Sequence, residues 1–88
     1  MTWKVEFDER AARELRKLNP QIPGEILTYL RKRIATTENP RRFGKSLSGA
    51  LGGLWRYRIR DYRLICSISE RELTVLILRV GHRRNVYV

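Results

Sequence analysis

Apolar and charged residues alternate near the start of the chain, which is typical of a half-buried β-strand. Trp3, Val5 and Phe7 are apolar, and the two residues between them are charged. Because successive side chains of a strand point to opposite faces, residues 3–7 are predicted to bury one face against a core. Asp8 ends the alternation, and its carboxylate is suited to accept the N–H groups at the start of a helix.

Apolar residues then recur at steps of three and four, which predicts two helices. The first helix is expected to end near residue 17 or 18, and its apolar stripe consists of Phe7, Ala11, Leu15 and Leu18. An Asn-Pro pair at positions 19 and 20 interrupts the period, after which residues 21–35 are predicted to form the second helix. The short link favours an antiparallel hairpin with both stripes on one sheet.

Three more strands are predicted in the second half of the chain, at residues 54–60, 62–69 and 73–80. The links between them are so short that only antiparallel hairpins fit, and the last strand is apolar on both faces, which places it inside the sheet. Residues 36–53 hold most of the glycines without a sustained period and are predicted to be a surface connection. The expected fold is one α+β domain over residues 1–88: an N-terminal strand, an antiparallel helix hairpin and a three-stranded antiparallel meander.

The charge of the chain indicates a polyanionic partner. Nineteen Lys and Arg residues stand against nine Asp and Glu residues, which gives a net charge of +10. Residues 41–88 contain 11 of the basic residues but only 3 of the acidic ones, so the functional surface is expected there. Fifteen of the basic residues are arginines, which favours forked contacts with phosphate or carboxylate groups.

Several other classes of protein are disfavoured by the sequence. No apolar run approaches the length of a membrane span, and acidic residues stand where a secretory signal needs an apolar segment, so a cytoplasmic location without membrane contact is expected. Cys66 is the single cysteine and lies in an apolar run, which predicts a buried structural thiol. No Asp, Glu and His cluster has the spacing of a metal site, so neither a metal nor another cofactor is expected.

An arginine at every second position marks the first strand of the meander. Arg56, Arg58 and Arg60 are expected to share one face at intervals of roughly 6.8 Å, and the next strand adds Arg63 close to the turn. Trp55 and Tyr57 should point the other way, as core residues rather than as platforms for base stacking. If the last strand is central, the tail with Arg83 and Tyr87 passes beside the same sheet. One concave basic site is therefore predicted from the set Arg56, Arg58, Arg63, Arg83 and Tyr87.

Further basic residues are candidates for RNA contacts outside this set. They are Arg41, Arg42, Lys45, Arg60, His82 and Arg84. His82 is the single histidine. Histidine commonly acts as a general acid or base, so His82 is a candidate for that role, and the alternative is an exposed turn residue.

The sequence resembles the RelE/ParE superfamily of bacterial toxins, and its RelE-like branch in particular. The likeness lies in the arginine-alternating strand followed by DYRLI, in the apolar strand ending in VGHRRNVY, and in the first helix, FDERAARELRKL. The resemblance implies a microbial ribonuclease-like α+β fold and a toxin that cleaves mRNA in the ribosomal A site unless an antitoxin wraps it. It also implies that Arg56 and Arg58 occupy two basic strand positions, which are lysines in RelE itself. By the same likeness, Arg63 is the arginine of the YRL segment, Arg83 the tail arginine and Tyr87 the terminal tyrosine.

Metal-free cleavage of RNA needs three groups. A base removes the proton of the attacking 2′-OH, cations stabilise the charge on phosphorus, and an acid protonates the leaving oxygen. The arginines suit the stabilising role, but they keep their protons and make poor bases. Tyr87 either acts as the base, with a pKa lowered by its cationic neighbours, or stacks on the scissile base.

Two functions of different class follow from the resemblance, together with a simpler one. The first is a ribosome-dependent mRNA endonuclease, which the combination of converging cations and a phenol favours. The second is a ParE-like inhibitor of DNA gyrase that cuts nothing, and the third is a module that only binds RNA. Either toxin is expected to be a monomer when free and to pair with an acidic or amphipathic antitoxin, and the endonuclease also with the 30S A site and mRNA.

Overall fold

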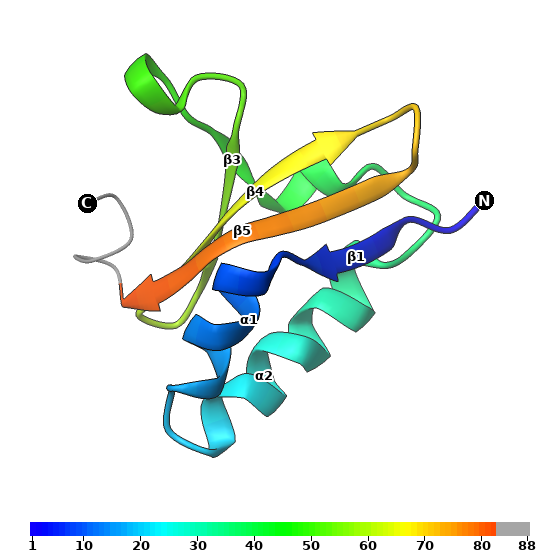
Figure 1. Cartoon of the computed structure of the whole chain (residues 1–88). Coiled ribbons are helices and arrows are strands. Elements are labelled where there is room, and N and C mark those ends of the chain that lie inside the picture. Colours follow the sequence, from blue (N-terminus) through cyan, green and yellow to red (C-terminus); the bar gives the residue numbers. More distant parts are fainter. Residues whose placement is uncertain (83–88) are drawn as a thin grey trace.

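The computed structural model describes residues 1–82 and shows a twisted sheet with two helices on one of its faces (Figure 1). The strands run in the order β1-β5-β4-β3-β2. Their bounds are β1 Lys4–Phe7, β2 Lys45–Ser46, β3 Trp55–Ile59, β4 Tyr62–Ser69 and β5 Thr74–His82. The α+β fold and the three-stranded antiparallel meander β3–β4–β5 predicted from the sequence are thereby confirmed.

Strand β5 lies inside the sheet, as its apolar sequence predicts. Its first half pairs in parallel with β1, and its whole length pairs antiparallel with β4. The register with β4 shifts between Ile65 and Cys66, which leaves Leu78 of β5 without a partner in the ladder. Such a bulge bends a sheet and increases its local twist.

The connection predicted for residues 36–53 contains a strand that the sequence pattern did not predict. Lys45 and Ser46 form the short edge strand β2, which pairs antiparallel with β3. Two residues are too few for an alternating pattern, so the strand leaves no signal in the sequence. Two 3-10 turns flank it, at Pro40–Phe43 and Gly49–Leu51.

The helices begin and end close to their predicted positions. Helix α1 spans Glu9–Arg16, and the carboxylate of Asp8 caps it by accepting a hydrogen bond from the backbone N–H of Ala11 at 2.8 Å. Helix α2 spans Gln21–Tyr29 and continues as a π-helical turn, Leu30–Ile34, rather than as the single helix predicted. Buried residues stand four apart at positions 26, 30 and 34, and the wider π turn keeps residues of this spacing on one side.

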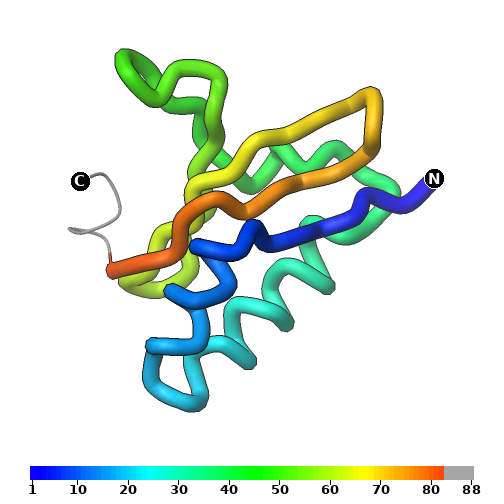
Figure 2. Tube along the Cα trace, viewed as in Figure 1, coloured from blue at the N-terminus to red at the C-terminus, as the bar shows by residue number. Residues whose placement is uncertain are grey.

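The hydrophobic core lies between the sheet and the two helices, which follow the same face of the sheet in the Cα trace (Figure 2). Its fully buried members include Ile26 and Ile34 from the helical side and Tyr57, Leu64 and Ile77 from the sheet. Within residues 1–82, no helix covers the opposite face (Figure 1). We call this face the open face.

Cys66 is part of this core, as predicted. Its thiol is fully buried 3.6 Å from the backbone oxygen of Trp55, and burial raises the pKa of the Cys66 thiol to about 12. The raised pKa keeps the thiol protonated in the folded chain up to strongly alkaline pH.

We predict that a thiol-specific reagent at pH 8 modifies the folded protein at least about a hundredfold more slowly than the chain in urea, because reaction needs an exposed thiolate. Between pH 8 and 10 the folded rate should keep rising, whereas the denatured rate levels off above an ordinary thiol pKa of about 8.5. Absorbance of the released reporter group measures both rates. Equal rates in the two states would contradict a buried Cys66.

Candidate functional site

The strand register brings the cationic side chains of β2, β3 and β4 together on the open face. Arg56 stands directly opposite Lys45 on one side and Ile65 on the other, and Arg58 stands opposite Arg63. Residues that face each other across paired strands point to the same side of the sheet. We call Lys45, Arg56, Arg58 and Arg63 the cationic face.

Desolvation distinguishes the members of the cationic face. Arg58 is exposed, and its Nε donates to the backbone oxygen of Arg60 at 3.3 Å. Arg56 is half-buried, and its Nε is shielded from solvent without an acceptor in the part of the chain that the structure describes. A shielded donor that lacks an acceptor costs free energy, of order 1–3 kcal/mol. An anionic oxygen placed over β3 would relieve that cost.

Tyr57 fixes β3 from the opposite side of the strand. The side chain is fully buried, and its hydroxyl donates to the backbone oxygen of Pro40 at 2.7 Å. Burial is also the main cause that raises the pKa of Tyr57, so the phenol remains a donor. Gly44 packs against the same ring, because a Cβ there would lie only 3.1 Å from Tyr57 Cε1. These contacts hold residues 40–44 against β3 and thereby place Lys45 beside Arg56.

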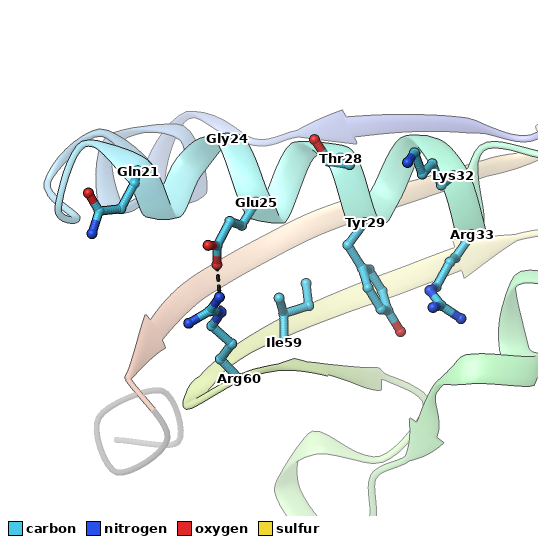
Figure 3. A pocket seen from close by; sticks show the side chains of 9 residues that line it. All are labelled: Gln21, Gly24, Glu25, Thr28, Tyr29, Lys32, Arg33, Ile59 and Arg60. Carbon is cyan, nitrogen blue, oxygen red and sulfur yellow. Dashed lines mark ion pairs between the residues drawn. The ribbon is translucent and has the colours of Figure 1, made fainter.

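Arg60 does not belong to the cationic face, contrary to the alternation predicted for residues 56, 58 and 60. It lies beyond the end of β3 with a φ of 55°, in a two-residue turn with Asp61. The left-handed backbone redirects its side chain to the helix side, where its Nε pairs with Glu25 of α2 at 2.7 Å (Figure 3). Together they line one end of a groove of about 710 Å³ along α2.

Arg41 and Arg42 form ion pairs with carboxylates and do not belong to the cationic face. Arg41 pairs with Glu70 in the β4–β5 turn at 2.9 Å, and its guanidinium lies over the ring of Trp55. Arg42 pairs with Glu38 and stacks on the ring of Phe43. Both ion pairs are partly exposed, so each contributes little to stability on average.

The remaining predicted residues lie at the end of β5 and beyond it. His82 packs edge-on against Tyr62, with ring centroids 5.9 Å apart. Tyr62 stands two residues before buried Leu64 on β4, so both rings belong to the helix-side face and not to the face of Arg63. Arg83, Arg84 and Tyr87, which the sequence predicts in the same site, lie outside the described residues.

Comparison with known proteins identifies the family. The chain matches, over residues 5–87, the model described as the ParE toxin of type II toxin-antitoxin system, parDE. The chain belongs to this toxin family. It is 36% identical to Toxin RelG of Mycobacterium tuberculosis over 87 residues, which cover 99% of this chain and 98% of that protein. It is 28% identical to the mRNA interferase toxin RelE of Escherichia coli over 85 residues, covering 94% of this chain and 85% of that one.

The fold of the toxin is also that of a solved relative. It superposes with a TM-score of 0.85 on a chain in the crystal structure of the toxin-antitoxin complex RelBE2 from Mycobacterium tuberculosis. The sequence identity is 34%, and the match covers 97% of the toxin and 95% of that chain. The resemblance to the RelE/ParE superfamily noted in the sequence is therefore confirmed, together with the fold that it implies.

Two residues that sequence reasoning missed fasten the end of β5 to α1. Glu14 accepts hydrogen bonds from Arg79 Nε at 3.1 Å and from the backbone N–H of Val80 at 2.9 Å. Strand β1 ends opposite Ile77. Beyond that residue, the Glu14 carboxylate accepts a backbone N–H of β5 that β1 does not reach. The one signal in the sequence is that Arg79 is the single charged residue in LTVLILRV. Within residues 1–82, no three His, Cys, Asp or Glu side chains are arranged to hold a metal ion, and no helix is long and apolar enough to cross a membrane.

We predict that Tyr57→Phe lowers the free energy of unfolding by about 1–2 kcal/mol, because the carbonyl of Pro40 then loses its buried donor. Urea denaturation followed by circular dichroism measures the change. Tyr62→Phe is the matched control, since within residues 1–82 the hydroxyl of Tyr62 makes no hydrogen bond. Equal losses in both variants would show that the bond to Pro40 contributes nothing specific.

Proposed function

We propose that this toxin is an endoribonuclease that cleaves mRNA on the ribosome and so inhibits translation. The observation that carries the proposal is the cationic face, where three arginines and a lysine of adjacent strands point to one side of the sheet. A relative of the toxin in Escherichia coli is named as an mRNA interferase toxin. A converging set of cations of this kind suits a phosphate whose charge increases during reaction.

The proposed reaction is attack of a 2′-OH on the adjacent phosphate, with departure of the 5′-oxygen of the next nucleotide. Arg58 and Arg63 would stabilise the additional charge on the phosphate oxygens, and Arg56 would bind the flanking backbone through its forked donors. Arg83 and Tyr87 complete the proposed catalytic set. No metal ion takes part in this scheme, because the guanidinium groups supply the positive charge.

The ribosome has a definite role in this proposal. Arginine does not release its proton near neutral pH, so the cationic face stabilises charge but is a poor general base. A catalyst with a weak base gains most when the 2′-OH and the phosphorus are already held in line. The 30S A site would supply that alignment by presenting the codon to the open face.

An acidic or amphipathic antitoxin is the proposed protein partner. The solved relative from Mycobacterium tuberculosis was crystallised as a toxin-antitoxin complex. A carboxylate-rich segment would neutralise the cationic face, and an apolar helix face would cover hydrophobic surface such as Leu27, which is 48% exposed on α2. Binding across the arginines would exclude RNA by direct competition.

The decisive test is cleavage of a defined message on programmed ribosomes, with the new 5′ ends mapped by primer extension. We predict that Arg63→Ala reduces the cleavage rate on the order of 10²-fold, as expected when one stabilising charge is removed. Arg71→Ala is the matched control, because Arg71 is an exposed arginine in the β4–β5 turn and should leave the rate near that of wild type. Intact message with wild-type toxin, together with trapped gyrase–DNA complexes, would overturn the proposal in favour of gyrase inhibition.

Truncation tests the contribution of the tail. We predict that removal of residues 84–88 abolishes detectable cleavage, because Tyr87 is lost, while the midpoint of urea unfolding stays close to wild type. The helices and strands described above end at His82, before the deleted residues. Full activity of the truncated toxin would remove Tyr87 from the mechanism.

A further inference from the structure

The open face continues past the arginines into a polar hollow of about 330 Å³. Side chains of β1, β4 and β5 and of the turn between β4 and β5 line it: Lys4, Glu6, Ser67, Ser69, Glu72, Thr74 and Leu76. The mechanism proposed above uses none of these residues. We call this hollow the polar pocket.

The strand register makes the polar pocket and the cationic face parts of one surface. Ser67 and Ser69 follow Arg63 and Ile65 at every second position of β4, so all four side chains point to the open face. Arg63 and Ser67 are four residues apart, which is roughly 13 Å along a strand. That distance is several times the rise of about 3.4 Å per stacked nucleotide. A strand of RNA bound at Arg63 therefore reaches the polar pocket with a flanking nucleotide, not with the one that is cut.

The central row of the polar pocket is built to hold a flat polar group. Glu6, Leu76 and Ser67 stand side by side on β1, β5 and β4. Leu76 offers an apolar floor, with a carboxylate on one side and a hydroxyl on the other. Within residues 1–82, neither the Glu6 carboxylate nor the Ser67 hydroxyl makes a hydrogen bond or ion pair, so both groups remain available.

Ser69 and Thr74 form the neighbouring row of the polar pocket, and the turn between β4 and β5 orients their hydroxyls. Ser69 Oγ accepts from the backbone N–H of Glu72 at 3.2 Å, and Thr74 Oγ1 donates to the backbone oxygen of Glu72 at 3.0 Å. The Ser69 hydroxyl therefore keeps its proton to donate, and Thr74 keeps lone pairs to accept. These hydroxyls suit the ribose and the edge of a base.

The charges of the polar pocket distinguish a base from a phosphate. The two carboxylates, Glu6 and Glu72, outnumber the single cation, Lys4, so the pocket disfavours a phosphate. Glu6 can instead accept from the amino group of a base. Adenine, cytosine and guanine carry such an exocyclic amino group, and uracil presents carbonyl oxygens instead. We propose that the polar pocket binds the base of a nucleotide flanking the cleavage site and selects bases with an exocyclic amino group over uracil. This inference rests on the proposed function, because it assumes a single-stranded message on the open face.

Binding to single-stranded oligonucleotides tests the proposal without cleavage. The probes are fluorescein-labelled, carry 2′-O-methyl groups that remove the attacking hydroxyl, and differ in one position at a time, which holds A, C, G or U. Fluorescence anisotropy with the full-length toxin gives a Kd for each probe. At one position we expect U to bind at least about fivefold more weakly than the amino-bearing bases, which is the low end of the discrimination that a specific base contact provides.

Glu6→Gln is the informative variant, and Glu9→Gln is its matched control. Each substitution removes one negative charge from an exposed glutamate, but Glu9 lies on α1, on the helix side of the sheet. The amide that Glu6→Gln introduces can donate to a uracil carbonyl, so this variant should lose the preference against U, whereas Glu9→Gln should preserve it. Both changes raise overall RNA affinity, so the readout is the ratio of Kd values between bases.

Two outcomes would overturn the base-binding role. One is a wild-type toxin without base preference at any position, and the other is the same ratio in the Glu6→Gln and Glu9→Gln variants. A Glu6→Gln variant that loses affinity for the antitoxin but keeps the base ratio would assign the polar pocket to the protein partner and reject RNA. Because the probes cannot be cut, failure to cleave message on ribosomes with an intact base preference would reject the proposed function alone.

Discussion

The alternation of strand β3 is the constraint on which the cationic face depends. Tyr57 and Ile59 are buried in the core, so Arg56 and Arg58 must project from the opposite side of the strand. Burial of two large side chains contributes about 3–6 kcal/mol. Two like charges roughly 6.8 Å apart cost about 0.6 kcal/mol in water and about 2.4 kcal/mol at an effective dielectric constant of 20. Core packing therefore outweighs the repulsion and keeps the arginines together without a bound anion.

The acidic residues of the toxin pair mainly with arginines outside the cationic face. The pairs are Arg13–Glu9, Arg41–Glu70, Arg42–Glu38, Arg60–Glu25 and Arg79–Glu14. Within the described residues, no carboxylate lies in an ion pair with Lys45, Arg56 or Arg58. Lys45, Arg56 and Arg58 therefore keep their positive charge without a carboxylate partner in the described part of the chain, which attracts a polyanion to β2 and β3.

Sequence patterns predict the parts of this structure that repeat, and they fail where a single residue changes direction. The period of two placed Arg56, Arg58 and Arg63 on one face correctly, because all three lie within regular strands. Arg60 was misplaced because its positive φ, which is uncommon for arginine, ends the alternation at the turn. Strand β2 has too few residues to show a period. The contact of Glu14 with Arg79 joins residues 65 positions apart, which only the folded chain brings together.

Under the proposed function, the division of the open face into cationic and polar halves has a consequence for RNA recognition. Phosphate contacts fix the position of a strand but carry no sequence information, whereas hydroxyls and carboxylates can distinguish the edges of bases. Arginines grouped at one end leave the other end free of strong phosphate binding, so a flanking base can turn toward the sheet there. The bulge between Ile65 and Cys66 lies at the boundary of the two halves and bends the surface there. A bound RNA strand would change from phosphate contacts to base contacts at this bend. Affinity and selectivity can therefore be varied separately on a single sheet.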